Sequence, residues 1–307
     1  MIRFVEKKAI PFAVSSILSI ASIILLLTIG LKPSIEFTGG SLLEVAFVEE
    51  RPGVTDMQEA LKTVNLGELV VQPVNDDAHI IKTRYISEEE HQSMLTVLRD
   101  EFGTGSEEAT KGIIERRVET IGPAVSSYLK SRASKAAIAV LLVIVAFIAY
   151  SFRKVSKPVA SWKYGITAVI AVVHDVVITM GAFVLLGHFF NIEVGISFVV
   201  AMLTVLGYSV NDTIVIYDRI REKLARRGSD HFDDTINVAI NETMTRSLIT
   251  ALTTLLVLTA LFIFGGESIK YFALALILGV FFGTYSSIFL AAPLLSVFEK
   301  IGSGKKA

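Results

Sequence analysis

The sequence predicts a polytopic α-helical membrane protein with six spans and a folded, water-exposed domain between the first two. Two observations predict this class. Six apolar stretches hold at most two ionisable side chains each, and a polar block of about a hundred residues separates the first stretch from the other five. Roughly 20 apolar residues at about 1.5 Å each match a hydrocarbon core of about 30 Å, and lipid requires such a segment to be a helix.

The six spans are predicted at residues 10–31, 134–152, 163–188, 194–217, 247–266 and 270–298. The first span follows Arg3, Lys7 and Lys8, as the apolar core of a signal peptide would. It is longer than such cores usually are, and no A-x-A cleavage site follows it. We therefore expect it to remain in the protein as a helix.

Lysine and arginine in the short loops predict the orientation. They gather in residues 1–9, 153–163, 218–246 and 299–307, whereas the loops at 188–193 and 267–270 hold only Lys270. Because positive side chains mark the cytoplasmic side, we expect both termini in the cytoplasm and residues 32–133 outside. From Lys32 to Lys135 the chain has 18 acidic and 12 basic residues, an imbalance that reflects sidedness and gives no support to nucleic-acid binding.

The outer block shows strand and helix patterns in the order β-α-β-β-α-β. Strand patterns at 41–48, 68–74, 79–85 and 112–121 alternate with helical patterns at 54–64 and 87–103, and Asn75–Asp77 is predicted as a turn. Ser87 and Glu90 form a capping box. This order is typical of an extracytoplasmic ferredoxin-like α+β domain, which says nothing about catalysis by itself.

The outer block shows no pattern of an enzyme or a metal site. It has no Ser/His/Asp set, no cluster with metal-ligand spacing and no glycine-rich phosphate loop, and the chain has no cysteine for a disulfide. His79 and His91 are single histidines, which we expect at the surface or partly buried.

Asp212 and Arg246 are the main candidates for chemistry in the membrane. A carboxyl group among apolar helices is costly as a charge and usually faces a partner or a water-filled cavity, so we interpret Asp212 as a proton carrier. Arg246 lies at a similar depth and is predicted to pair with it until protonation releases the pair. The alternatives are a hydrogen-bonded aspartate that holds helices together and an arginine that only anchors the topology.

Two further polar sets lie within the spans. Thr250, Thr253 and Thr254 follow Arg246 on one helix face, where they could line a hydrated path or bond to their own helix carbonyls. Asp175 lies near mid-membrane and is a candidate second relay group. The neighbouring His174 need not share its face, and the pair could instead serve helix packing.

Glycines and apolar spacing predict packing, hinges and one surface helix. Gly279, Gly283, Ser287 and Ala291 recur every four residues, which indicates close helix packing. Gly39–Gly40 and Gly122–Pro123 flank the outer domain and are predicted hinges, the alternative being ordinary turns. Ile236, Ile240 and Met244 indicate a separate helix lying along the membrane after Gly228.

One stretch in the fourth span carries a specific resemblance. Residues 207–222 read GYSVNDTIVIYDRIRE, which closely resembles the signature of the SecF family. His174–Val176, Asn241–Thr243 and Gly283–Phe289 extend the resemblance. Glu36-Phe37-Thr38-Gly39-Gly40 is similar to the family's Asp-Phe-x-Gly-Gly, although Glu36 stands where the family has Asp, which leaves the role of that carboxylate open.

The resemblance implies a function and partners. Members are membrane proteins of the resistance-nodulation-division type that work with SecD and use the proton-motive force to promote late translocation of preproteins across the prokaryotic cytoplasmic membrane. The implied partners are SecD, the SecYEG translocon, the translocating preprotein, YajC, YidC and the lipid bilayer. Asp212, Arg246 and the adjacent Asn211 fall in the matching motifs. Protons are the only expected cofactor, and no metal or chemical active site is expected.

Two other functions fit the same layout. The chain could be one half of an efflux transporter for lipids or drugs, but the outer domain shows no apolar-aromatic cavity in its pattern. It could also be an assembly subunit that only stabilises SecD. Proton flux in an Asp212→Asn variant distinguishes the last possibility from a proton-driven subunit.

Overall fold

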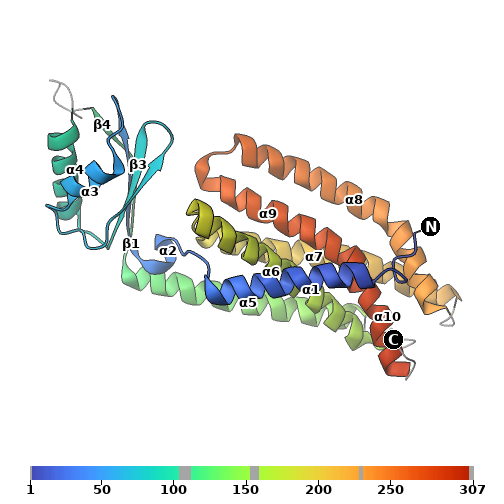
Figure 1. Cartoon of the computed structure of the whole chain (residues 1–307). Coiled ribbons are helices and arrows are strands. Elements are labelled where there is room, and N and C mark those ends of the chain that lie inside the picture. Colours follow the sequence, from blue (N-terminus) through green and yellow to red (C-terminus); the bar gives the residue numbers. More distant parts are fainter. Residues whose placement is uncertain (1, 104–111, 153–158, 228–230, 304–307) are drawn as a thin grey trace. The chain divides into compact units, whose positions relative to one another are not determined.

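A computed structural model describes residues 2–103, 112–152, 159–227 and 231–303 of the chain (Figure 1). The chain divides into two compact units: a helical unit, Met1–Lys32 with Ala133–Ala307, and an outer unit, Pro33–Arg132. The loop residues Arg153, Lys154, Lys157, Gly228, Lys305 and Lys306, which entered the predicted topology, lie outside the described residues.

The outer unit is a four-stranded antiparallel sheet with two main helices. Its elements are α2 (Ile35–Thr38), β1 (Gly40–Phe47), α3 (Val54–Leu61), β2 (Val70–Val74), β3 (Ala78–Thr83), α4 (Glu88–Phe102) and β4 (Ile113–Ile121). The strand order is β2-β3-β1-β4, with β1 shifted in register against β4 between Glu44 and Val45. The predicted ferredoxin-like arrangement is confirmed.

Every second side chain of β1 points to the face of the sheet that packs against the two main helices, and these side chains form the core of the outer unit. Leu43, Val45 and Phe47 are buried with Met57, Leu61, Met94, Leu95 and Leu98 of the two helices. The predicted capping box at the start of α4 is confirmed, because Ser87 Oγ accepts from the Glu90 N–H and the Glu90 side chain accepts from the Ser87 N–H.

The outer-unit histidines, expected at the surface or partly buried, are both buried. His79 is 1% and His91 is 7% exposed. The ring of His79 hydrogen-bonds the Pro52 carbonyl at 2.8 Å, and the ring of His91 lies between Glu88 and Glu115. Both ring nitrogens of His91 therefore have a polar neighbour, whereas Nδ1 of His79 is buried without a hydrogen-bond partner among the described residues. The sequence pattern did not show these neighbours.

Ion pairs on the surface of the outer unit keep two carboxylates charged. Arg116 binds Asp77 with an N–O distance of 2.5 Å, and the hydrogen bond holds the pKa of Asp77 below its ordinary value. Arg84 binds Glu90 and likewise lowers the pKa of Glu90. Both acids therefore stay ionised when the surrounding medium becomes mildly acidic.

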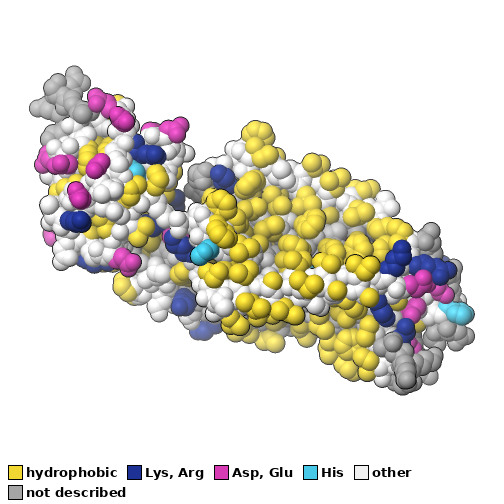
Figure 2. All heavy atoms as spheres, in the orientation of Figure 1, with side chains coloured by type: hydrophobic (Ala, Val, Ile, Leu, Met, Phe, Trp, Pro, Cys, Tyr) yellow, Lys and Arg dark blue, Asp and Glu magenta, His cyan; other side chains and the backbone are white. Residues whose placement is uncertain are grey.

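Within its described residues, the helical unit contains six helices long and apolar enough to cross a membrane. Its elements are α1 (Ala9–Thr28), α5 (Pro123–Ser151), α6 (Ser161–Phe190), α7 (Ile196–Arg227), α8 (Phe232–Phe264), α9 (Glu267–Ser286), the π-helical segment η1 (Ser287–Ala291) and α10 (Ala292–Ser303). Hydrophobic side chains cover the sides of this unit, and charged side chains gather at the end that carries both termini (Figures 1 and 2).

The helices divide into a central and a peripheral set. α6, α7 and α9 pack on one another and are the most buried, whereas α1, α5 and α8 expose most of their apolar surface. The change of pitch at η1 has a local cause. Pro293 has no N–H for the carbonyl one turn earlier, and a π-bulge absorbs this loss.

Small residues allow the central helices to approach closely. A Cβ added to Gly279 of α9 would lie 2.0 Å from Val205 Cγ2 of α7, and one added to Gly283 would lie 3.1 Å from Ser209 Cβ. On α6, a Cβ at Gly181 would lie 2.3 Å from Ser22 Oγ of α1. These positions accept only glycine without local movement.

The prediction of a separate helix along the membrane is wrong. α8 runs without a break from Phe232 to Phe264, and Ile236 and Ile240 lie in the core of the helical unit. No glycine or proline interrupts the sequence between them and the apolar run, so the helical hydrogen bonds continue.

The four predicted hinge residues lie within the outer unit. Gly39 and Gly40 have φ of 76° and 136°, and a Cβ at Gly40 would lie 2.6 Å from the Thr83 carbonyl oxygen. Pro123 is the first residue of α5, and this helix continues through the unit boundary at Arg132–Ala133. The glycine pair therefore has a steric requirement, and hinge motion at the four residues stays a prediction.

Candidate functional site

Asp212 lies on α7 with an incompletely bonded carboxyl group. Its side chain is 7% exposed. Ser247 Oγ, on α8, donates to Asp212 Oδ1 at 2.8 Å. Asp212 Oδ2 is buried and has no hydrogen-bond partner among the described residues. A buried carboxyl oxygen without a partner is unfavourable, so the group is prepared to bind a proton or a cationic partner.

Arg246 does not form the predicted ion pair in this structure. It makes no ion pair within 4.0 Å to any described residue, although its charge acts on the Asp212 carboxyl. Its exposed side chain lines a hollow of about 280 Å³ with Asp218, Glu222 and Thr243. Arg246 and Ser247 are consecutive residues of α8, so their side chains point in directions about 100° apart around the helix axis. The side chain of Ser247 is the one that faces Asp212.

The other residues predicted near Asp212 lie on the exposed side of α7 and α8. Asn211 and Thr250 are both exposed. The hydroxyls of Thr253 and Thr254 donate to carbonyls one turn back on α8, as the alternative interpretation expected, and Thr254 also contacts Tyr208 of α7. A row of polar side chains thus faces outward at the depth of the membrane.

Asp175, at the centre of the bundle, is fully bonded. It is 0% exposed, and its Oδ2 accepts from Ser209 Oγ of α7 at 2.5 Å and from Ser286 Oγ of α9 at 2.8 Å. His174 Nδ1 lies 2.9 Å from Asp175 Oδ1, so the two neighbours do share an interaction. Three helices meet at this carboxyl group.

Hydroxyl groups continue from Asp175 along the buried side of α7. Thr213 Oγ1 lies 2.8 Å from Ser287 Oγ, and Tyr217 OH lies 2.6 Å from Thr167 Oγ1. Sequence reasoning did not name Ser209, Thr213, Tyr217, Ser247 or Ser286. Ser209, Thr213 and Tyr217 recur every four residues on one face of α7, which was the available signal for these three. Ser247 and Ser286 lie on other helices, so no spacing along the chain linked them to the aspartates.

The charged C-terminal part of α7 is fastened to α8, and α8 is fastened to the N-terminal segment. Glu242 accepts from Lys223 Nζ at 2.6 Å and from Arg219 Nε at 2.5 Å. The Asn241 side chain both accepts from the Ile2 N–H and donates to the Ile2 carbonyl. The Asn241 and Glu242 positions of the sequence signature therefore hold elements together at one end of the bundle.

No group of three or more His, Cys, Asp or Glu able to hold a metal ion occurs in the described ranges. The fold and the two buried aspartates define a multi-pass membrane protein with ionisable groups inside its helix bundle and a small α+β domain inserted after the first span.

Comparisons with known proteins identify the family. Residues 103–300 match the family described as protein export membrane protein SecD/SecF, C-terminal, and residues 24–49 match the SecD/SecF GG motif. The chain is 36% identical to the protein translocase subunit SecF of Thermobaculum terrenum, over 97% of this chain and 94% of the relative. It is 38% identical to the subunit of the same name from Desulfurispirillum indicum, over 96% and 90%. The chain belongs to the SecD/SecF family.

Two solved structures share the fold. The crystal structure of SecDF from Thermus thermophilus, described as a translocon-associated membrane protein, matches with a TM-score of 0.80 and 30% identity, over 96% of this chain and 38% of the SecDF chain. SecDF in a super-membrane-facing form matches with a TM-score of 0.69 and 29% identity, over 99% and 39%. This chain thus spans about two fifths of a SecDF chain.

Proposed function

We propose that the protein is the SecF-like subunit of a Sec export complex, which uses the proton-motive force with SecD to promote late translocation of preproteins. The observation that carries the proposal is the Asp212 carboxyl, buried with one free oxygen beside Ser247. An ionisable group held in this way inside a membrane bundle is suited to bind and release a proton.

Arg246 is the proposed partner of Asp212 when the carboxyl group is ionised. When Asp212 is ionised, rotation of the Arg246 side chain toward the free Oδ2 gives a charge-assisted pair; when Asp212 is protonated, the attraction is lost and Ser247 remains the only partner. Two discrete pairings of α7 with α8 follow from one proton.

SecD is the proposed partner of the outward-facing polar row. Asn211, Arg246 and Thr250 are exposed within apolar helices, and lipid gives such groups no hydrogen-bond partner. The SecDF chains of the solved structures are more than twice as long as this chain, and the remainder of such a chain is the natural cover. The site is therefore completed by SecD.

The wider setting follows from family membership. We place the protein in the cytoplasmic (inner or plasma) membrane of a prokaryote, with both termini in the cytoplasm and the outer unit on the far side. SecYEG and the translocating preprotein are the further proposed partners, with YajC and YidC as additional members of the assembly.

The available energy limits the mechanism. One proton crossing about 100 mV releases roughly 2.3 kcal/mol, which biases a domain between two positions about 50-fold. A stable domain needs about 5–15 kcal/mol to unfold. Repeated small steps that prevent backward sliding of the preprotein are therefore the proposed mode of action.

The decisive experiment uses Asp212→Asn in the complex with SecD, reconstituted in vesicles where proton flux and preprotein translocation are measured together. Asparagine keeps the shape and the hydrogen bond from Ser247 but cannot titrate, so both quantities should fall to background while the complex stays intact. The matched control is Asp233→Asn at the start of α8, whose carboxylate pairs with Lys300 at 3.1 Å and does not line the Arg246 hollow.

Three other outcomes contradict the proposal. Full export by Asp212→Asn removes the proton-carrier role. Normal proton flux with lost export would place the proton path elsewhere, and drug or lipid efflux by the reconstituted wild-type complex without export would favour an efflux transporter.

A further inference from the structure

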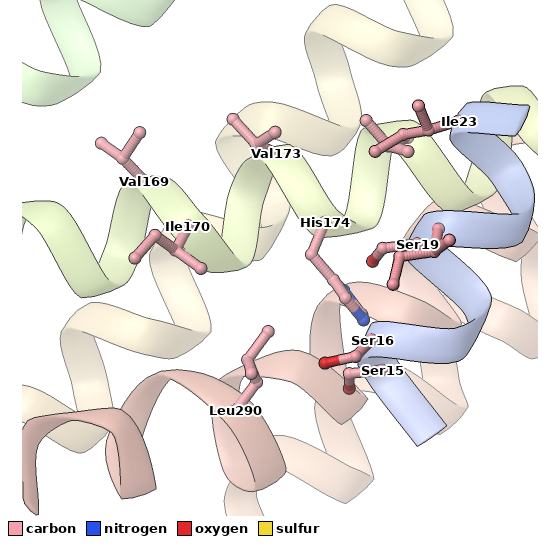
Figure 3. Close-up of a pocket in the computed structure, with 11 residues that line it drawn as sticks. Ser15, Ser16, Ser19, Ile23, Val169, Ile170, Val173, His174 and Leu290 are labelled. Carbon is pink, nitrogen blue, oxygen red and sulfur yellow. The ribbon is translucent and has the colours of Figure 1, made fainter. Parts of the chain in front are cut away.

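A cavity of about 430 Å³, open along one side to the surface of the bundle, lies between α1 and α6, away from Asp212. Its walls are apolar, from Ile20, Ile23, Val169, Ile170, Val173, Val177 and Leu290. Its polar part consists of His174 on α6 and the hydroxyls of Ser15, Ser16 and Ser19 on α1. Figure 3 shows the His174 ring extending from α6 toward these serines.

Two polar atoms at the cavity are buried without a partner. His174 is 6% exposed, and its Nε2 has no hydrogen bond within the described part of the chain. Ser15 is 3% exposed, and its Oγ likewise has none. Each unsatisfied buried group is unfavourable, and a water molecule with several polar partners removes that penalty where space allows.

The bond between His174 and Asp175 determines what Nε2 can do. When Asp175 Oδ1, at 2.9 Å, accepts a hydrogen bond from Nδ1–H, the neutral ring has its lone pair on Nε2, directed at the serine side. A water molecule on Nε2 can then transfer a proton to it, and the imidazolium that forms keeps its Nδ1 hydrogen bond to the carboxylate.

We propose that this cavity binds water at its serine-lined end and that His174 is a proton-accepting site separate from Asp212. The titratable groups near the ring are Asp175, on the same helix, and Tyr285 of α9, whose ring stacks on it at 6.4 Å. α1 contributes only serines and apolar side chains to the cavity, and η1 contributes Leu290.

Protonation of His174 would affect the packing of α1, because α1 forms one wall of the cavity. α1 lies against α6 through the close contact of Ser22 with Gly181, and the chain enters the outer unit soon after α1 ends. A charge on His174 attracts water and the serine hydroxyls, and so changes how α1 packs on α6. This consequence rests on the proposed export function, whereas the binding of water and proton does not.

Thiol labelling tests for water. The chain has no cysteine, so Ser16→Cys and Ser19→Cys each introduce a single thiol on α1. In membranes with co-expressed SecD, both should react with a charged, water-soluble methanethiosulfonate at least tenfold faster than Ile17→Cys, which lies at the same depth but outside the cavity. N-ethylmaleimide after denaturation confirms that each thiol is present. Equal, slow labelling of all three means that acyl chains fill the cavity and overturns the proposal.

Histidine NMR tests for the proton. In the purified complex with 15N-labelled histidine, the Nε2 signal lost in His174→Gln should move from a neutral to a protonated shift as the medium is acidified. A signal that stays neutral throughout overturns the proposal. The same titration in Asp212→Asn should be unchanged, so a failure at His174 and a failure of the Asp212 mechanism give different results.

Discussion

Asp175 and Asp212 differ in how completely their carboxyl groups are bonded. Asp175 accepts from two serines and contacts His174, and it joins three central helices. Among the described residues, Asp212 has one hydrogen-bond partner, Ser247, and its Oδ2 has none. A fully satisfied buried network resists change, whereas a partly satisfied one has a second arrangement available. Asp175 is therefore suited to hold the bundle together, and Asp212 to change partners.

Substitution of Arg246 tests the second arrangement. Arg246→Lys keeps the charge but loses the planar fork, so we expect export in the complex to fall severalfold, and Arg246→Met to reduce it to the level of Asp212→Asn. Translocation yield per assembled complex is the measurement. Arg226→Met is a control, because Arg226 is exposed and pairs with Glu222 near the end of α7. Normal export by Arg246→Met would show that the arginine only anchors the topology.

At the scale of single residues the sequence predicted the identity of the ionisable groups better than their contacts. Asp212, Asp175 and Arg246 stand out because charged groups are rare in apolar spans. Which neighbour faces Asp212 depends on a rotation of about 100° per residue and on the crossing of α7 and α8. A shift of one residue along α8 decides whether Arg246 or Ser247 faces Asp212. The hydrophobic periodicity of the sequence does not determine which of the two it is.

Close contact of α9 with α7 is the feature that organises the central helices. Gly279→Ala would place its Cβ within 3 Å of all three side-chain carbons of Val205, which is β-branched and stiff. We expect the variant to lose about 1–3 kcal/mol of stability. Gly207→Ala on α7 is the matched control, since a Cβ there meets nothing within 4 Å and alanine is the better helix former.

Thermal aggregation of the purified chain alone, without SecD, gives the comparison. Gly279→Ala should aggregate several degrees lower than the wild type, and Gly207→Ala at the same temperature or higher. If the two variants behave alike, the close approach of α9 to α7 does not contribute to stability.

The order of helices and strands could be predicted from the sequence, but the points at which the long helices α5 and α8 begin could not. The β-α-β-β-α-β order and the capping box follow from local periods and caps, which act over a few residues. The unbroken length of α8 results from Ile236 and Ile240 packing in the helical unit, a tertiary effect. For α5, Pro123 was read as part of a hinge, but proline is also favoured in the first turn of a helix.

The boundary between the two units gives the whole molecule two covalent connections of different kinds. One is the short segment after α1, where Lys32 meets Pro33. The other is α5, a helix of 29 residues that passes through the boundary between Arg132 and Ala133. Of these two connections, α5 crosses the boundary as continuous helix, and a helix transmits rotation and displacement along its axis. We therefore expect α5 to couple the helical unit to the outer unit.

Breaking the helical continuity of α5 tests whether the outer unit is driven through this link. We expect insertion of Gly-Gly after Arg132 to reduce export to near the Asp212→Asn level, because glycine is a poor helix former and two glycines allow the parts to move independently. Proton flux and binding to SecD should stay close to normal, since α7 and α8 are untouched. The measurements are translocation yield, proton flux and co-purification with SecD. The same insertion in the Asn75–Asp77 turn, remote from α5 in sequence, should preserve export. If the α5 insertion also leaves export unchanged, a continuous helix is not what carries the proton step to the outer unit.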